Sequence, residues 1–300
     1  MDLEQKSIER IKTASEMSLY HYGQPLVCTY SGGKDSDVML ELFKRSGVPF
    51  EVHNSHTTAD APQTVYHIRE VFRDLELQGI KCSIDYHVQS DGSRITMWNL
   101  IPKKLMPPTR LVRYCCSELK ETFGKGRFIA TGVRWDESRK RKEWGSFSQP
   151  DKKLHVSDKM MLNTDNDMRR KLTEHCMQKN KMVVNPIIDW TAKDIWEFIN
   201  QEHLNVNVLY QCGYERVGCI GCPMAGRRKR QKEFADFPTY KSAYIKAFER
   251  MLAVRKARGL RTVYKSGEEV FNWWIEEKEL PGQYVMEIGE ADLTGGYKEK

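Results

Sequence analysis

LVCTYSGGKDSD, residues 26–37, leads from an apolar run through two glycines into a segment with helical hydrophobic spacing. The glycines allow the chain to turn tightly off a strand and to approach an anion without a Cβ in the way. The helix start that follows offers unpaired N–H groups and the positive end of its dipole. Ser31 and Ser36 add hydroxyl donors, and Lys34 adds a mobile charge. The stretch predicts a phosphate-binding loop between a strand and a helix, although not of the Walker type, which requires G-x-x-x-x-G-K-[ST].

The SGGKDS segment resembles the SGGxDS pyrophosphate loop of the adenine-nucleotide α-hydrolase superfamily, which includes ATP pyrophosphatases and the sulfonucleotide (PAPS/APS) reductases. The resemblance implies an adenine nucleotide, ATP or PAPS, bound with the help of Mg²⁺. It also implies catalytic roles for Lys34 and Asp35. The binding residues that it indicates in this loop are Ser31, Gly32, Gly33, Lys34, Asp35 and Ser36.

Composition sets broad limits on the function. The chain of 300 residues is 40% hydrophobic and 30% charged, and its net charge of +7 suits a phosphorylated substrate or a nucleic acid without discriminating between them. The charged start of the sequence has no apolar signal core, and no apolar run of membrane-spanning length occurs, so we expect a cytoplasmic protein without membrane contact. In a reducing compartment the eight cysteines favour metal or redox chemistry over disulfides.

Strand and helix patterns alternate along the first half of the chain, which predicts a Rossmann-like α/β fold with a doubly wound parallel sheet. In such a sheet ligands bind beyond the carboxyl ends of the strands. The predicted strands are 26–30, 48–53, 82–88 and 127–132, and the predicted helices are 3–20, 36–46, 62–78, 116–122 and 191–199, the last with Thr191 as N-cap.

Two stretches read as irregular, the basic segment 99–108 and a polar insertion at 140–180. After Cys222 the chain becomes strongly helical and basic. We therefore expect a nucleotide-binding α/β domain at 1–204 and a helical, cysteine-bearing region at 205–300.

Two further segments resemble nucleotide-facing elements of the PAPS-reductase family. HNSHTTADAPQT, residues 53–64, matches a polar turn before a helix start, although Gln63 stands in place of the usual Glu. TGVRWDESRKR, residues 131–141, matches a GxRxxxSxxR element whose arginines can bind oxyanions bidentately. A capped helix start and a solvated run of charges are the structural alternatives. The resemblance assigns nucleotide binding to Thr57, Asp60, Gly132, Arg134, Ser138 and Arg141, with Arg134 also catalytic.

Cysteines form a third constellation. RYCCSELK, residues 113–120, resembles the tandem-cysteine segment of cluster-containing APS reductases, and a Cys-x-x-Cys follows about 100 residues later. Four thiolates are what a [4Fe–4S] cluster requires, and a structural zinc site is the alternative. The candidate metal ligands are Cys115, Cys116, Cys212, Cys219 and Cys222. The choice between Cys115 and Cys212 stays open, and Cys28, Cys82 and Cys176 are expected to be buried or incidental thiols.

The family's reductases carry their nucleophile in a C-terminal E-C-G-[IL]-H motif, whereas this sequence has no cysteine after Cys222. We therefore expect cleavage of ATP at its α-phosphate, giving AMP and pyrophosphate, coupled to Fe–S-dependent sulfur transfer from a sulfur donor to a nucleic-acid acceptor. One alternative is a PAPS or APS reductase that uses another thiol or a thiol reductant protein. The second alternative is a non-catalytic nucleotide-binding subunit of a nucleic-acid-modifying complex. The basic run 227–232 could contact a phosphate backbone or be a solvated helix face.

Overall fold

The computed structural model describes residues 2–89, 91–137, 146–148 and 181–276, and it contains a six-stranded sheet of order β3-β2-β1-β4-β6-β5. Strands β1 to β4 and β6 are parallel, and β5 pairs with β6 in the antiparallel sense. The predicted α/β fold with a parallel sheet is thereby confirmed. The strand bounds are β1 Leu26–Thr29, β2 Phe50–Ser55, β3 Cys82–Asp85, β4 Arg127–Ala130, β5 Phe147–Ser148 and β6 Lys181–Val184.

The sheet order fixes where a ligand can bind. From β1 the chain proceeds outward through β2 to β3 and then returns to place β4 on the other side of β1. In open α/β sheets such a reversal marks the place where ligands bind, which here lies beyond the carboxyl ends of β1 and β4. The predicted phosphate loop follows β1 directly, so it lies at this position. Strand β6 was not predicted, because its four residues resemble any short apolar run.

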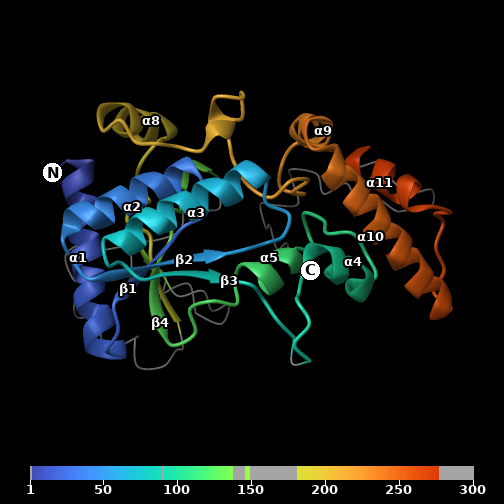
Figure 1. Ribbon diagram of the computed structural model, residues 1–300, viewed down its shortest axis with the longest axis horizontal. Coiled ribbons are helices and arrows are strands. Elements are labelled where there is room, and N and C mark those ends of the chain that lie inside the picture. Colours follow the sequence, from blue (N-terminus) through green and yellow to red (C-terminus); the bar gives the residue numbers. More distant parts are fainter. Residues whose placement is uncertain (1, 90, 138–145, 149–180, 277–300) are drawn as a thin grey trace, which may run out of the picture.

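Helices cover one face of the sheet. Helices α1 (Leu3–Tyr22), α2 (Lys34–Ser46) and α3 (Pro62–Leu77) pack with the sheet in a single core cluster (Figure 1). Helix α8 (Ala192–Gln201) contacts α2 and begins with a capping box, in which the Thr191 hydroxyl accepts the Asp194 N–H at 3.2 Å. The predicted N-cap is confirmed, and so are these four helices to within a few residues at each end.

A second core cluster joins the helices beyond the strand ends. Figure 1 shows β2 and β3 pointing toward this helical part of the molecule. Its helices are α4 (Met97–Lys104), α5 (Tyr114–Leu119), α9 (Arg227–Asp236), α10 (Pro238–Ala257) and α11 (Gly267–Glu276). The helical character expected after Cys222 is confirmed. The cluster draws residues from both sides of position 204, and the domain boundary there stays a prediction.

Helix α4 corrects the expectation of an irregular stretch at 99–108. Thr96 accepts the Asn99 N–H with its hydroxyl, and Met97, Leu100 and Ile101 bury their side chains in the second cluster. Capping and burial outweigh Pro102, which lies inside the helix and lacks the N–H of an ordinary helical residue. The insertion expected at 140–180 lies almost entirely outside the described residues.

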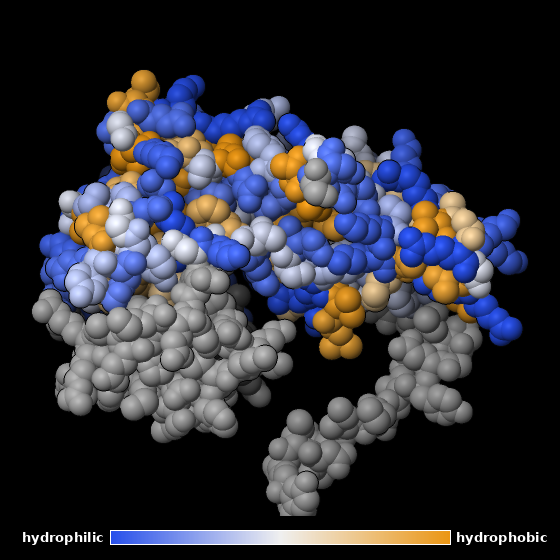
Figure 2. Space-filling view, turned by 90° about the horizontal axis from the view of Figure 1, so that it is seen from below, coloured by the Kyte–Doolittle hydropathy of each residue, from blue (hydrophilic) through white to orange (hydrophobic). Residues whose placement is uncertain are grey.

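Within the described residues, no helix is both long and apolar enough to cross a membrane. Figure 2 shows one face of the molecule, on which the coloured surface is mainly hydrophilic and hydrophobic residues gather in small separate groups. Scattered apolar residues of this kind are normal on a folded protein and by themselves mark no interface.

A buried ion pair ties the first helix to the segment before α8. Arg10 is 5% exposed and donates from its two terminal nitrogens to the Asp189 carboxylate at 2.6 and 3.1 Å. Lys6 adds a contact of 2.9 Å to the same carboxylate. Burial alone would raise the pKa of Asp189, but the hydrogen bonds from Arg10 and Lys6 outweigh it, and the pKa lies below its ordinary value.

We expect Asp189→Asn to lower the free energy of unfolding by about 3 kcal/mol at pH 7, because it leaves the buried Arg10 without its counter-charge. The ordinary pKa of Asp is about 3.9. Since folding depresses that pKa, the ion pair stabilises the protein fully above about pH 4 and is lost as the pH falls further. Urea unfolding at neutral and acid pH measures both effects.

The matched control is Asp74→Asn, at an exposed pair with Arg73, which should change stability by less than about 0.5 kcal/mol. A loss at Asp189→Asn that equals the control, or that persists undiminished at acid pH, would contradict the role of the ion pair.

Candidate active site

The turn after β1 is shaped by hydrogen bonds within the loop. Gly32 adopts the left-handed conformation with φ +71°. The Ser36 hydroxyl donates to the Gly33 carbonyl at 2.7 Å and lies 3.1 Å from the Gly33 N–H, which donates to it. Ser36, expected to bind phosphate, therefore first holds the loop in shape. Ser31 lies next to it, with the two hydroxyl oxygens 3.3 Å apart.

Tyr210 and Asn207 hydrogen-bond to the same loop. Tyr210 ends the short 3₁₀ turn Val208–Tyr210, and Asn207 is the N-cap of that turn. The Tyr210 hydroxyl accepts the Lys34 backbone N–H at 2.9 Å, at the first residue of α2. Asn207 is fully buried and donates its side-chain amide to the Gly32 carbonyl at 3.2 Å. Sequence reasoning missed both roles. Tyr210 lies in a recognisable turn segment, but nothing local in the sequence connects either residue to the loop.

The predicted catalytic side chains come together. Arg134 is 4% exposed and donates from Nε to the Asp35 carboxylate at 2.7 Å. The Lys34 ammonium lies 3.4 Å from the other oxygen of that carboxylate. Gly132 lies beside the same turn, where a Cβ would make an ordinary van der Waals contact of 3.5 Å with the Asp35 backbone. The loops after the neighbouring strands β1 and β4 thus place two cations and one carboxylate at the crevice.

Arg134 is also held from a third segment, because Nη1 lies 3.3 Å from the Trp190 carbonyl oxygen. The other two residues of the same predicted element, Ser138 and Arg141, lie outside the described residues. Their assignment to oxyanion binding therefore stays a prediction.

The second predicted nucleotide segment, after β2, contacts the cysteine-bearing chain. Asp60 accepts the Thr57 N–H at 2.8 Å, which closes a small turn. The Thr57 hydroxyl lies 3.3 Å from the Cys219 sulfur, and the Ile220 N–H donates to the Ala59 carbonyl at 2.7 Å. Contact of Thr57 and Asp60 with the ribose or base remains a prediction. The structure adds a feature that the sequence did not reveal, namely that this loop borders the cysteines.

Four thiols gather beside this loop. Cys115 and Cys116 lie on α5, and Cys219 and Cys222 come from the turn before α9. Cys116, Cys219 and Cys222 are all near enough to Cys115 to raise the pKa of its thiol electrostatically. The hydrogen bond from Cys115, aided by one of 3.0 Å from Arg113, lowers the pKa of Cys116. The same bond and burial raise the pKa of Cys115.

Cys212 lies on an exposed turn. Of the remaining thiols, Cys28 is buried in β1 and Cys82 is half-buried in β3, as expected, while Cys176 lies outside the described residues. Among the residues that the structure describes, no three Cys, His, Asp or Glu side chains are arranged tightly enough to hold a single metal ion.

Gly32→Ala tests the loop geometry. The new Cβ would lie 2.8 Å from Ile68 Cγ1 in a left-handed backbone, so we expect a stability loss of about 2 to 4 kcal/mol from strain and crowding together. Calorimetric titration should show ATP binding weakened by at least about tenfold, as the displaced loop misaligns its N–H groups.

Gly47→Ala is the control, because Gly47 has φ +68° and open space around its Cβ position. It should cost about 1 to 2 kcal/mol and leave ATP binding intact. Equal ATP affinities for the two variants would refute the assignment of the loop.

Comparison with known proteins gives independent findings. Residues 25–225 match the family model of the phosphoadenosine phosphosulfate reductase domain. An uncharacterised protein of Methanocaldococcus jannaschii is 27% identical over 289 residues, covering 93% of this chain, which itself spans only 58% of that protein. The adenosine 5′-phosphosulfate reductase of Geobacillus kaustophilus is 25% identical over 204 residues, 67% of this chain and 74% of the reductase.

Among solved structures, the phosphoadenylyl-sulfate reductase of Candida auris aligns with a TM-score of 0.45 and 14% identity, covering 71% of this chain and 88% of that one. The family match spans every predicted motif from the phosphate loop to the Cys-x-x-Cys. On the strength of that match, which confirms the resemblance seen in the sequence, the chain belongs to the phosphoadenosine phosphosulfate reductase domain family.

Proposed function

We propose that the protein cleaves ATP at its α-phosphate, releasing pyrophosphate and leaving an adenylated acceptor, and that sulfur then displaces AMP from that acceptor. The observation that carries this proposal is the contact between the two halves of the site. The loop that is expected to face the nucleotide touches the cysteine segment, with the Thr57 hydroxyl 3.3 Å from the Cys219 sulfur. Nucleotide and thiol chemistry can therefore act on one acceptor.

The phosphate half of the reaction needs positive charge and alignment. Phosphoryl-transfer catalysis consists almost entirely of positioning and electrostatic stabilisation. In this site Lys34 and Arg134 flank the crevice, and Asp35 is the carboxylate that would hold Mg²⁺ together with the phosphates. Arg134 now pairs with Asp35, so a bound phosphate would compete for the guanidinium, which has further N–H donors to offer.

The four gathered thiols fit a [4Fe–4S] cluster better than zinc. One zinc ion needs all four sulfurs about 2.3 Å from a single point, a geometry that the adjacent Cys115 and Cys116 meet with difficulty. A cluster takes at most one protein thiolate on each of its four irons, so its ligands stand farther apart and two of them can be sequence neighbours. We propose Cys115, Cys116, Cys219 and Cys222 as candidate ligands. If three of them bind, the fourth iron stays open and would be the place that holds sulfur.

The second candidate is a sulfonucleotide reductase, the activity named for the Geobacillus relative. The observation in its favour is Cys212. This thiol is exposed and is not one of the four cysteines proposed as ligands. It stands two residues after Tyr210, whose hydroxyl contacts the predicted phosphate loop. If this candidate holds, Cys212→Ala would abolish sulfite release while leaving the iron content unchanged.

Product analysis separates the two reactions. Anaerobically purified protein is given ATP together with sulfide and nucleic acid as the acceptor in one reaction, and a sulfonucleotide with a thiol reductant in another, and the products are separated by chromatography. We expect AMP and pyrophosphate from ATP. Lys34→Ala should lower that rate by about 100-fold or more, because it removes a charge aimed at the phosphates.

Lys44→Ala, a lysine in the last turn of the same helix with an i,i+3 partner in Glu41, should leave the rate unchanged. Sulfite from the sulfonucleotide, with ATP untouched, would overturn the main proposal in favour of the reductase.

Metal analysis tests the ligand set independently of turnover. We expect Cys116→Ala, Cys219→Ala and Cys222→Ala each to lose most of the bound iron and the broad visible absorption of an iron–sulfur centre. Cys212→Ala should retain both. If Cys212→Ala loses the iron and Cys115→Ala retains it, Cys212 is a ligand in place of Cys115. If the protein contains stoichiometric zinc and no iron, the metal site is a zinc site and not a cluster.

A further inference from the structure

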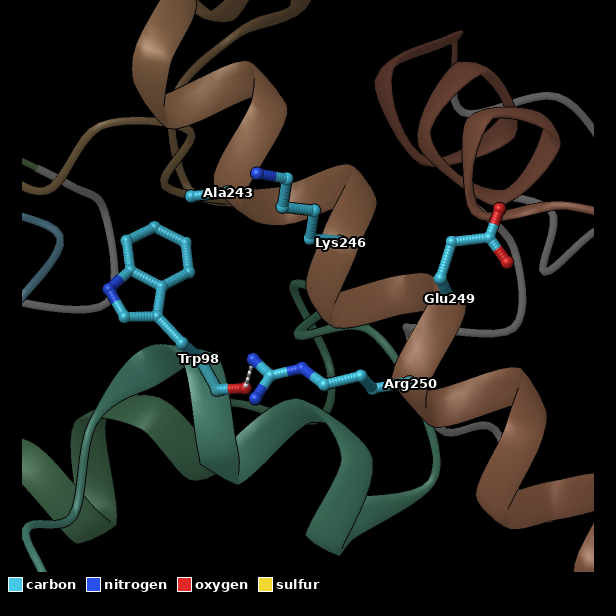
Figure 3. Close-up of a pocket in the computed structure, with 5 residues that line it drawn as sticks. All are labelled: Trp98, Ala243, Lys246, Glu249 and Arg250. Carbon is cyan, nitrogen blue, oxygen red and sulfur yellow. Dashed lines mark hydrogen bonds between the residues drawn. The ribbon is translucent and has the colours of Figure 1, made fainter.

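An open groove of about 460 Å³ lies between α4 and α10, outside the phosphate loop and the cysteines. Figure 3 shows the side chains that line it, from one turn of α4 and two turns of α10. They are Trp98, Ala243, Lys246, Glu249 and Arg250. The groove combines one aromatic ring with cationic groups, and neither the nucleotide nor the cluster accounts for it.

Arg250 is fixed in the groove by an irregularity in α4. In a regular helix the Trp98 carbonyl would accept the N–H of residue 102, but Pro102 has none. The freed carbonyl instead accepts a hydrogen bond of 2.7 Å from Arg250, as the dashed line in Figure 3 shows. One guanidinium N–H is thereby used, and the others have no partner among the residues that the structure describes, so they could bind a ligand.

The Trp98 ring is supported on one side and accessible from the groove. Its edge-to-face contact with Tyr244 has a centroid distance of 5.0 Å, and the Tyr240 ring lies 6.1 Å away. The residue is half-buried rather than enclosed. A rigidly held indole with free surface is a stacking platform for a flat ring.

The wall of the groove is apolar, and the charged groups at its rim carry a net charge of +1, from Lys246 and Arg250 against Glu249. Its one acidic residue, Glu249, accepts the Gly267 N–H at 2.6 Å at the start of α11 and points away from Trp98 in Figure 3. Lys246 and Arg250 are exposed on the groove side. The surrounding sequence carries a small basic excess, since residues 205–300 contain 17 Lys and Arg against 13 Asp and Glu. Charge complementarity therefore favours a polyanion.

Both walls of the groove are attached to the loop that follows β2. At the start of α4 the Met97 N–H donates to the Thr58 hydroxyl at 2.9 Å. Near the start of α10 the Tyr240 hydroxyl donates to the Asp60 carbonyl at 2.5 Å. This loop also contacts Cys219. A chain molecule held in the groove would therefore pass beside the proposed reaction site.

We propose that this groove binds a single-stranded stretch of nucleic acid, with one base stacked on Trp98 and the neighbouring phosphates paired with Lys246 and Arg250. The inference rests on the proposed function, to which it adds the single-stranded form of the acceptor and the surface that holds it. A single strand is required because a base inside a duplex cannot present its face to a side chain.

The test uses the full chain and fluorescein-labelled DNA and RNA strands of about twelve nucleotides, with fluorescence anisotropy as the readout and a chelator present to prevent turnover. We expect binding that weakens steeply between about 50 and 200 mM salt. Trp98→Ala should weaken it by about 5- to 100-fold, the equivalent of one stacked base, while Trp98→Phe retains most of the affinity. Lys246→Ala should weaken it and reduce the salt slope by about one.

Lys193→Ala removes the same charge from α8, where the lysine pairs with Glu197, and it should bind as the unaltered protein does. Circular dichroism and iron content verify that each variant is folded. Comparison of the DNA and RNA strands identifies which nucleic acid is preferred.

Absence of binding, equal affinity of Trp98→Ala and the unaltered protein, or equally tight binding of a duplex would each overturn the inference. The proposed reaction fails separately. If ATP yields no pyrophosphate while strand binding still depends on Trp98, the reaction is wrong and the groove assignment holds. If pyrophosphate is released but strand binding does not depend on Trp98, the groove assignment is wrong.

Discussion

The close approach of the Gly32 backbone to α3 is the constraint on which the site depends. A Cβ at this position would stand 2.8 Å from Ile68, so the turn that ends β1 packs directly against the next crossover helix. The left-handed backbone of Gly32 directs the chain into α2, and Ser36 then closes the loop on itself. Because β1 lies between β2 and β4, the position of this turn also decides which side chains can reach it.

A second constraint joins the sheet to the helical region. The loop that follows β2 reaches across to the cysteine segment through the hydrogen bond from Ile220 to Ala59 and to α10 through the Tyr240 hydroxyl. The two core clusters therefore meet at the loop where nucleotide binding is expected. The proposed chemistry, which would bring a nucleotide, a metal cluster and an acceptor together, needs this kind of junction, because the candidate residues for it lie on several elements.

The correct predictions of secondary structure rest on patterns among residues that are close in sequence. The parallel sheet follows from alternating patterns, and the start of α8 follows from Thr191 with Asp194 three residues on, since both depend on neighbours in sequence. The placement of Lys34, Asp35 and Arg134 in one site was predicted from the family resemblance and not from the local sequence pattern. Contacts of Tyr210 and Asn207 with the loop span more than 170 residues and could not be predicted.

The expectation of an irregular stretch at 99–108, where the structure has α4, was wrong for a different reason. Pro102 and its basic neighbours are typical of a loop, whereas burial of Leu100 and Ile101 against α10 provides what the local sequence lacks. The half-burial of Cys115 and the exposure of Cys212 are likewise set by the fold, while the choice between them as metal ligands stays a prediction. Tertiary packing decides such placements, and the local sequence does not reveal it.

The ion pair between Arg10 and Asp189 has a consequence for how the family can diversify. Asp189 adjoins Trp190, whose carbonyl supports Arg134 at the crevice and whose indole donates to Ser7 on α1 at 3.0 Å. The first helix is thus part of the support of a site residue more than 100 positions away in the chain. Segments 3–22 and 185–190 should consequently evolve as one unit: homologues that replace Arg10 should also replace Asp189, and chimaeras that exchange only one segment should assemble the crevice poorly.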